Sequence, residues 1–153
     1  MDKGLRRKAL SMIADKFESK LYFKAVETQV PTDPTPNALS LPSVHIARAI
    51  ENIREHTNVG HETDFPLDIV IFVHAPEDVD IAKSDAEDEA LEALMELMLD
   101  STFREIVDEI EIKTVDPGPL ALAPLGYQGG VFPPYGAIRI SVSLNFNYQA
   151  IDR

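Results

Sequence analysis

The chain has 153 residues, no cysteine and a formal net charge of -12 at pH 7. The lack of cysteine excludes disulfides, thiol nucleophiles and cysteine zinc sites. The acidic balance argues against a general nucleic-acid binder, which needs a basic surface. There is no run of about 20 apolar residues to cross a membrane and no signal-peptide pattern, so we expect a single domain, residues 1–153, made and used in a cytoplasm.

The first predicted element is an amphipathic helix, followed by a strand and a loop. Leu5, Ala9, Met12, Ile13 and Phe17 follow the spacing of one apolar helical stripe. Residues 21–30 (LYFKAVETQV) are rich in aromatic and β-branched side chains and predict a short strand. Residues 31–42 contain four prolines, which predict a loop.

Residues 43–58 fit two patterns. Ile46, Ala49, Ile50 and Ile53 make a helical stripe, and alternate residues from Val44 to Ile50 make a weaker strand pattern. The period slightly favours a helix. The next stretch, NVGHETDFP, predicts a turn.

The middle of the chain predicts one buried strand and two helices. Residues 67–75 (LDIVIFVHA) are nearly all apolar, which is typical of a strand deep in a sheet. Ser84 and Glu87 form a capping box that predicts the start of a long helix. Thr102 and Glu105 predict the start of a short second helix over residues 103–110, before a further strand at 111–115.

The last predicted strand alternates strictly between apolar and polar residues. Its apolar positions are Ile138, Ile140, Val142, Leu144, Phe146 and Tyr148. Between them lie Arg139, Ser141, Ser143, Asn145 and Asn147, a face that suits water or the close approach of another surface. The whole order predicts an α+β fold, with a mainly antiparallel sheet of about four strands and helices packed on one face.

The sequence contains no convincing catalytic, cofactor-binding or metal-binding motif. No serine lies in a G-x-S-x-G elbow, and the glycines of residues 126–130 are not followed by Lys-Ser/Thr. The best metal-ligand cluster, formed by His56, His61, Glu62 and Asp64, lacks the helical frame of H-E-x-x-H. The acidic run 77–89 matches no calcium loop, and the basic cluster in residues 3–8 reads as a solvated helix face. We therefore expect a protein of binding and assembly, with no enzyme activity, cofactor or metal.

The loop of residues 117–136 is unusually apolar for a surface loop. It contains leucines at 120, 122 and 125 together with Tyr127, Phe132 and Tyr135. Such a loop either forms a partner surface or folds back over the core, and the sequence leaves both alternatives open.

The order of elements resembles the tail terminator (tail completion) proteins of long-tailed, non-contractile phages of the lambda type. The resemblance is carried by the opening helix LRRKALSMIADKF, the strand LPSVHIARA, the apolar strand LDIVIFVHAP, the broken helix ALEALMELMLDSTFREIVDEI and the final strand AIRISVSLNFNY. It covers nearly the whole chain, and it implies that residues 43–50 form a strand.

The resemblance also implies a function. Such proteins assemble as six-membered rings on the tail tube, stop its growth and dock the head connector, while double-stranded DNA later passes through the hole without specific binding. This places the chain at the head-proximal end of the virion tail, with itself, the tube protein and the connector as partners. The residues that we expect at subunit or tube contacts are Tyr127, Phe132, Pro133, Pro134, Tyr135, Ser141, Ser143, Asn145 and Asn147.

Three other functions remain open at this point. Another head–tail connector or neck protein shares the same class, and deletion of the gene separates them because overlong tails mean a terminator. An unrelated binding module would use the loop 117–136 as a pocket wall. A small hydrolase or metal enzyme would reveal itself by a stoichiometric metal in the purified protein.

Overall fold

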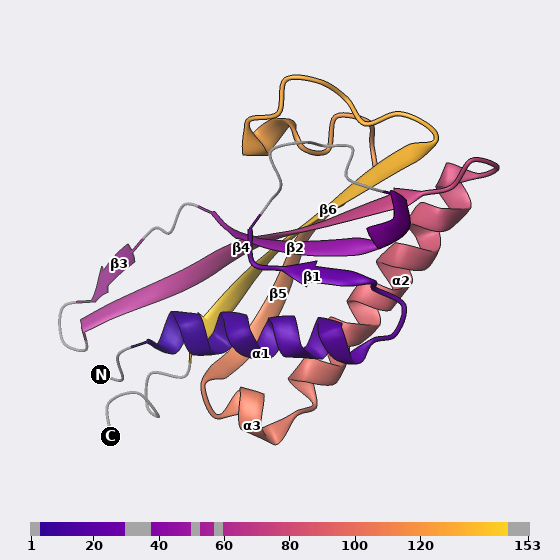
Figure 1. Cartoon of the computed structure of the whole chain (residues 1–153). Helices are drawn as coiled ribbons and strands as arrows, with labels where there is room; N and C mark the ends of the chain where they lie inside the picture. Colours follow the sequence, from indigo (N-terminus) through magenta and orange to yellow (C-terminus); the bar gives the residue numbers. More distant parts are fainter. Residues whose placement is uncertain (1–3, 30–37, 50–52, 57–59, 147–153) are drawn as a thin grey trace.

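The computed structural model of the chain describes residues 4–29, 38–49, 53–56 and 60–146. Figure 1 shows the long strands β4 and β6 side by side, with the two long helices on one side of the sheet and the loop before β6 on the other. The elements are α1 (Leu5–Ser19), β1 (Ala25–Glu27), the short 3-10 helix η1 (Ala38–Ser40), β2 (Ser43–Arg48), β3 (Ile53–His56), β4 (Gly60–His74), α2 (Val79–Met98), α3 (Ser101–Arg104), β5 (Val107–Asp116), a second short 3-10 helix η2 (Ala123–Leu125) and β6 (Tyr135–Phe146).

The sheet confirms the α+β class, with more strands than the four expected. Its order is β1-β2-β4-β6-β5, and β3 pairs with the beginning of β4 outside this path. β1 runs parallel to β2, whereas the other pairs are antiparallel. β4 and β6 therefore form the centre, and β1 and β5 form the two edges.

The main core lies between the helices and one face of the sheet, which we call the helix face. The predicted stripe of α1 is buried there through Leu5, Ala9, Ile13 and Phe17. The ring of Phe17 meets Phe23 edge-on, with the ring centroids 5.5 Å apart. The strands contribute their alternate residues to the same core, namely Val44, Ile46, Phe65, Leu67, Ile69, Ile71, Val73, Ile138, Ile140, Val142, Leu144 and Phe146.

The helical preference read from residues 43–58 is wrong, and the strand implied by the resemblance is confirmed. Val44 and Ile46 pair with Ile71 and Ile69 and point into the core with them. Pairing along a buried neighbouring strand outweighs a weak local helical period, because strand preference depends mainly on the packing of neighbours.

The turn predicted before residue 67 is also wrong, because β4 begins at Gly60 and continues through Pro66. The N–H of Ala49 donates to the carbonyl of Pro66 at 3.1 Å. Pro66 has no N–H to donate in return, so the ladder between β2 and β4 ends at the preceding pair, Arg48 and Leu67. Proline is tolerated here because β2 ends at Arg48, so no further ladder bond is lost.

The helices begin at other caps than those predicted. α2 starts five residues before Ser84, where the carboxylate of Asp78 accepts a hydrogen bond from the N–H of Ile81 at 3.1 Å. Similarly, Asp100 rather than Thr102 caps α3, accepting from Thr102 N at 2.9 Å. α3 ends at Arg104, so the predicted helical residues from 107 onward belong instead to β5.

Candidate interaction surface

A loop covers part of the sheet face opposite the helices, which we call the open face. This covering loop, residues 117–134, joins β5 to β6 and lies over one end of that face (Figure 1). Its buried side chains Leu122 and Val131 pack on Val70, Phe72 and Ala137 of the sheet. The fold therefore has a second, smaller core under the loop.

Hydrogen bonds hold the covering loop along its length. Near its start, the ammonium of Lys83 on α2 donates to the carbonyl of Pro117 at 2.7 Å. In its middle, Arg139 Nε donates to the carbonyl of Ala121 at 2.9 Å. At its end, the N–H of Ala75 donates to the carbonyl of Pro134 at 2.9 Å. Because α2, β6 and the end of β4 all hold it, the loop presents a defined outer surface.

The outer surface of the covering loop is apolar. Leu120 and Phe132 are 63% and 60% exposed. A Cβ on Gly130 would lie 2.6 Å from the Phe132 ring, so a glycine here lets the ring lie close to the backbone. Both alternatives for this loop thus hold in part, because one set of its apolar residues closes a core and another set faces outward.

The residues expected at contacts fall into three groups by exposure, and one further residue lies outside the described part. Phe132, Pro133 and Pro134 are exposed, and Tyr127, Tyr135, Ser141 and Asn145 are half-buried. Ser143 is 3% exposed, and its hydroxyl has no hydrogen-bond partner. Asn147 lies outside the described residues.

An ion pair lies on the open face beside the covering loop. Arg139 Nη1 lies 3.2 Å from the carboxylate of Asp68, and both side chains are largely buried. The guanidinium also holds Ala121, so the same side chain joins the central strands to the loop. Charge-assisted bonds of this kind fix geometry more firmly than neutral ones.

A serine, a histidine and a glutamate meet at the edge of the open face. The hydroxyl of Ser43 donates to His45 Nε2 at 2.9 Å, while Nδ1 donates to the carbonyl of Gln29 at 3.0 Å and lies 3.4 Å from the Glu27 carboxylate. Burial lowers the pKa of His45, outweighing the raising effects of Gln29 and Glu27. A serine, a histidine and a carboxylate in this order also form the catalytic triad of many hydrolases.

The burial of this group favours a structural role. Ser43 and His45 are both 3% exposed, and the imidazole packs edge-on against Phe72 with centroids 5.4 Å apart. The Ser43 hydroxyl is therefore hardly open to solvent in this arrangement. The hydrogen bonds therefore serve to satisfy buried polar groups where β1 joins β2.

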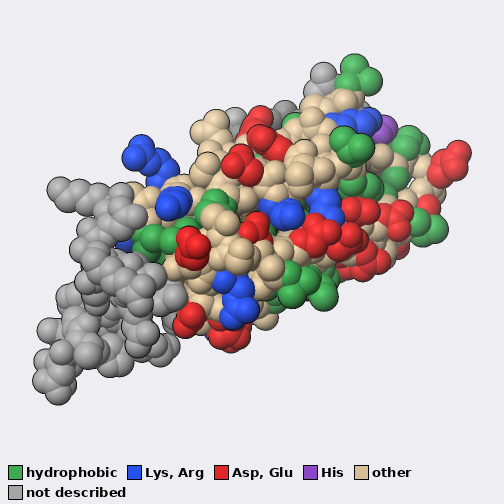
Figure 2. Space-filling model, turned by 90° about the horizontal axis from the view of Figure 1, so that it is seen from below, with side chains coloured by type: hydrophobic (Ala, Val, Ile, Leu, Met, Phe, Trp, Pro, Cys, Tyr) green, Lys and Arg blue, Asp and Glu red, His purple; other side chains and the backbone are tan. Residues whose placement is uncertain are grey.

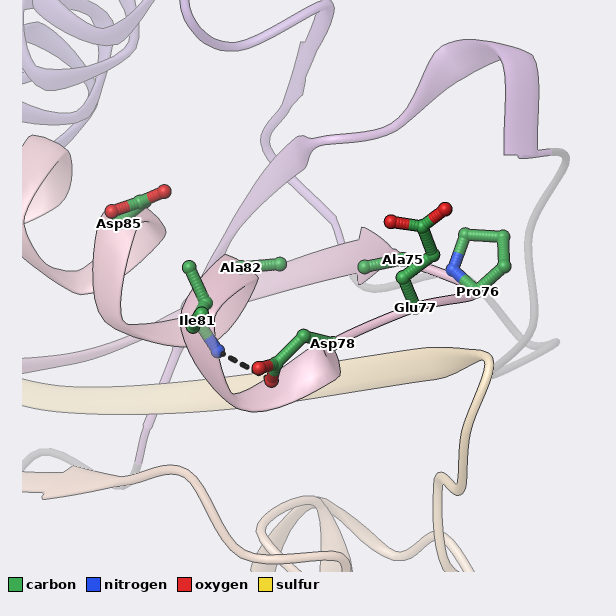
Figure 3. Close-up of a pocket in the computed structure, with 7 residues that line it drawn as sticks. All are labelled: Ala75, Pro76, Glu77, Asp78, Ile81, Ala82 and Asp85. Atoms are coloured by element: carbon green, nitrogen blue, oxygen red, sulfur yellow. Dashed lines mark hydrogen bonds between the residues drawn. The ribbon is translucent and has the colours of Figure 1, made fainter.

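A pocket of about 430 Å³ lies between the end of β4 and the first turns of α2. Figure 3 shows the residues that line it. Ala75, Pro76, Ile81 and Ala82 line it together with the carboxylates of Glu77, Asp78 and Asp85. Asp78 already caps the helix. Serine, threonine, cysteine and histidine are absent from the described residues that line it.

Two further findings concern metals and membranes. In the described part of the chain, no three His, Asp or Glu side chains are grouped so that they could hold a metal ion. The side chains of His56, His61, Glu62 and Asp64 lie outside the described part. None of the described helices is long and apolar enough to cross a membrane.

The predicted solvated face of the first helix is only partly solvated. Arg7 and Lys8 are exposed. In contrast, the guanidinium of Arg6 lies over the rings of Phe65 and Phe146, 5.8 and 5.7 Å from their centroids. Arg6 thus covers the end of the main core.

Sequence reasoning missed the polar groups that organise the open face. Asp68 stood out as the only acid inside the apolar stretch 67–75, and Arg139 as the only charge in the last strand. One isolated acid and one isolated base in two apolar strands could have predicted that the strands lie side by side and form an ion pair. Nothing in the sequence connected Glu27 of β1 with Ser43 and His45 of β2, because the loop between the two strands hides their pairing.

No family model matches this sequence, and no curated protein matches it. One solved structure with the same fold is a chain described as "Virion of native gene transfer agent (GTA) particle". The similarity covers 95% of this chain and 98% of that chain, with a TM-score of 0.53 and 10% sequence identity. The two chains therefore share an overall fold along almost their whole lengths.

Proposed function

We propose that this chain is a structural, non-enzymatic virion protein that acts as a tail terminator. Copies form a ring, expected to be a hexamer, on the end of the tail tube, stop its polymerisation and provide the docking surface for the head connector. The observation that carries the proposal is the fold shared with a virion chain over 95% of this chain. The order of its sequence elements supports the terminator role in particular.

The distribution of exposed side chains supports a role in assembly. The covering loop exposes Leu120 and Phe132 from a loop that its own core and hydrogen bonds hold in place. A pre-formed apolar surface binds a partner without first having to order itself. We assign this outer surface of the loop to contact with the tube or with a neighbouring copy.

The net charge supports passage of DNA through a ring. Six chains would carry a formal charge of 6 × (-12) = -72. Acidic side chains repel phosphates, so an acidic channel lets DNA pass without holding it. A basic channel wall would contradict this part of the proposal.

Deletion of the gene in the particle that encodes it tests the function. If the chain ends tube growth, electron micrographs will show overlong tails without heads. Tails of normal length that lack heads would instead support the alternative, another connector or neck protein. Normal, infectious particles would overturn both.

A charge placed on the covering loop tests the proposed contact surface. We expect Phe132→Asp to leave the fold intact, because the ring is exposed, and to block assembly. Circular dichroism and thermal unfolding check the fold, and incorporation into particles checks assembly. Gln128→Asp is the matched control, since it adds the same charge at an exposed polar position of the same loop. Unfolding of Phe132→Asp would show that Phe132 belongs to the core.

A further inference from the structure

The two edges of the sheet differ in length. In the described part of the chain β5 pairs only with β6, so its outer side presents the main-chain groups of a strand of ten residues. The opposite edge, β1, has three residues. Unpaired main-chain groups along an edge strand are a template for a strand of another chain. A three-residue edge offers little to pair with, so the long edge carries most of this risk.

Apolar side chains increase the risk at β5. Ile112 pairs with Val142 of the main core. Val115 likewise pairs with Ile140 of that core, so both β5 side chains lie on the helix face. They nevertheless remain 43% and 38% exposed. A second strand beside β5 would cover them, and burial of apolar surface favours association.

Two irregularities interrupt the ladder between β5 and β6. The register shifts by one residue at Asp108 and again at Lys113, so that each is an extra residue of β5. This count is that of a β-bulge, which bends the strand and increases its twist. The longest stretch of β5 in register with β6 is residues 109–112. The outer main-chain groups therefore do not form one straight row for a second strand to follow.

The two extra residues of β5, Asp108 and Lys113, are charged and exposed. The ammonium of Lys113 lies 3.0 Å from the carboxylate of Glu111, and each of these two side chains is half exposed. A strand placed beside them would displace part of the water around both charges, which costs free energy. Bulges and charged side chains are two of the features by which sheet proteins protect an unpaired edge.

The net charge of β5 also opposes pairing between copies. The strand carries four acidic side chains and one basic side chain, which sum to a formal charge of -3. Two copies of β5 side by side would bring these acids together, and like charges on neighbouring strands are destabilising. Figure 2 shows the side of the molecule with the helices, and acidic side chains gather over part of it. Contact between two such edges is therefore opposed by charge as well as by geometry.

We propose that β5 is a protected edge of the sheet, closed to strand pairing by its bulges at Asp108 and Lys113 and by its charges. Copies of this chain therefore associate through side-chain surfaces, and they do not extend the sheet from one copy to the next. This inference goes beyond the proposed function, because it describes how association is limited whether or not the chain ends a tail. A protein of closed assemblies gains from such protection, since pairing along edges has no built-in end.

Deletion of both extra residues tests the role of the bulges. Without Asp108 and Lys113, the remaining residues of β5 alternate regularly between the helix face and the open face, so the core positions of Ile112 and Val115 can be kept. We expect this variant to stay folded by circular dichroism. We also expect it to associate at least about tenfold more tightly than the natural chain in analytical ultracentrifugation, equivalent to about 1.4 kcal/mol.

A matched control separates the bulges from their charges. Asp108→Ala combined with Lys113→Ala removes the same two charges as the deletion and leaves the net charge unchanged, but it keeps both extra residues. The gain in association expected from it is much smaller. Equal gains in the control and in the deletion variant would contradict the role of the bulges.

Hydrogen exchange shows whether β5 is the place of contact. In the natural chain, the β5 amides that face away from β6 are expected to exchange equally fast in dilute and concentrated samples. In the deletion variant, the same amides are expected to become protected as the concentration rises. Protection of these amides in the concentrated natural chain would overturn the proposal, because strands would then pair at this edge.

A substitution variant decides the matter if the deletion disturbs the fold. Glu109→Thr combined with Glu111→Thr keeps the length of the chain and removes two like charges from the edge. We expect it to stay folded and to gain protection at the same amides, by a smaller factor than the deletion. A folded deletion or substitution variant whose β5 amides exchange as in the natural chain would overturn the proposal. None of these outcomes depends on tail length, so the proposed function succeeds or fails separately.

Discussion

The helix face and the open face of the sheet are built from the same strands, yet they are packed in different ways. Every strand residue on the helix face of β4 between Phe65 and Val73 is buried in one continuous core. The open face combines a small core under the covering loop with a polar stretch that includes Asp68, Arg139 and Ser143.

This difference indicates which face contributes most to the stability of the fold. The helix face buries large apolar side chains that stabilise the protein in proportion to their area. The open face depends on fewer apolar residues and on directional polar bonds. Changes on the two faces should therefore differ in size and in how far they spread.

The largest loss of stability is expected from the helix face. Phe17→Ala removes a fully buried ring that packs on Phe23 and should lower the free energy of unfolding by about 4 kcal/mol. Denaturant unfolding measures it. Glu18→Ala, the next residue and exposed, serves as the control and should change stability by less than about 0.5 kcal/mol. Similar losses in both variants would show that α1 is not docked as described.

A smaller loss is expected from the ion pair of the open face. Arg139→Met leaves the buried Asp68 carboxylate without its partner and should cost about 3 kcal/mol. The double variant with Asp68→Leu removes both charges and should recover most of that loss. If the double variant is as unstable as the sum of both single variants, the two groups do not act as a pair.

A still smaller loss of stability is expected from the small core under the covering loop. Leu122→Ala should cost about 2 kcal/mol, because the loop can collapse partly into the space left. Hydrogen exchange should rise within residues 117–134 and stay unchanged in β4 and α1. A rise spread evenly over the chain would show that the two cores form one cooperative unit.

The smallest effect concerns pH at the edge of the open face. Burial lowers the pKa of His45, so the unfolded chain binds its proton more readily than the folded chain. Stability should be full above the ordinary pKa of histidine and fall as the pH drops through that value toward the lowered pKa. His45→Asn should reduce this dependence, which unfolding between pH 8 and 5 would measure, with His74→Asn as the control. Equal slopes in the natural chain and His45→Asn would contradict this assignment.

The elements with strong periodicity were predictable from the sequence. The stripe of α1 and the alternation of β6 gave both their type and their buried face correctly, because in each case one face meets the core. The helix starts were misplaced because Asp78 and Asp100 compete as caps with Ser84 and Thr102, and local sequence does not rank such neighbours.

The rest depends on contacts between distant parts of the chain. Pro66 reads as a strand breaker, but its place at the end of the β2–β4 ladder makes it harmless. The covering loop has no period at all, and its anchors on Lys83 and Arg139 come from separate elements. The exposure of Phe132 was expected, whereas the burial of Ser143 required the packed structure.

The first measurement to make is the native mass of the purified chain across concentrations, with electron microscopy of the same sample. We predict a species of six times the 17.0 kDa chain that appears in the micrographs as a six-fold ring. A strict monomer at every concentration would contradict a ring that forms through contacts between copies of this chain.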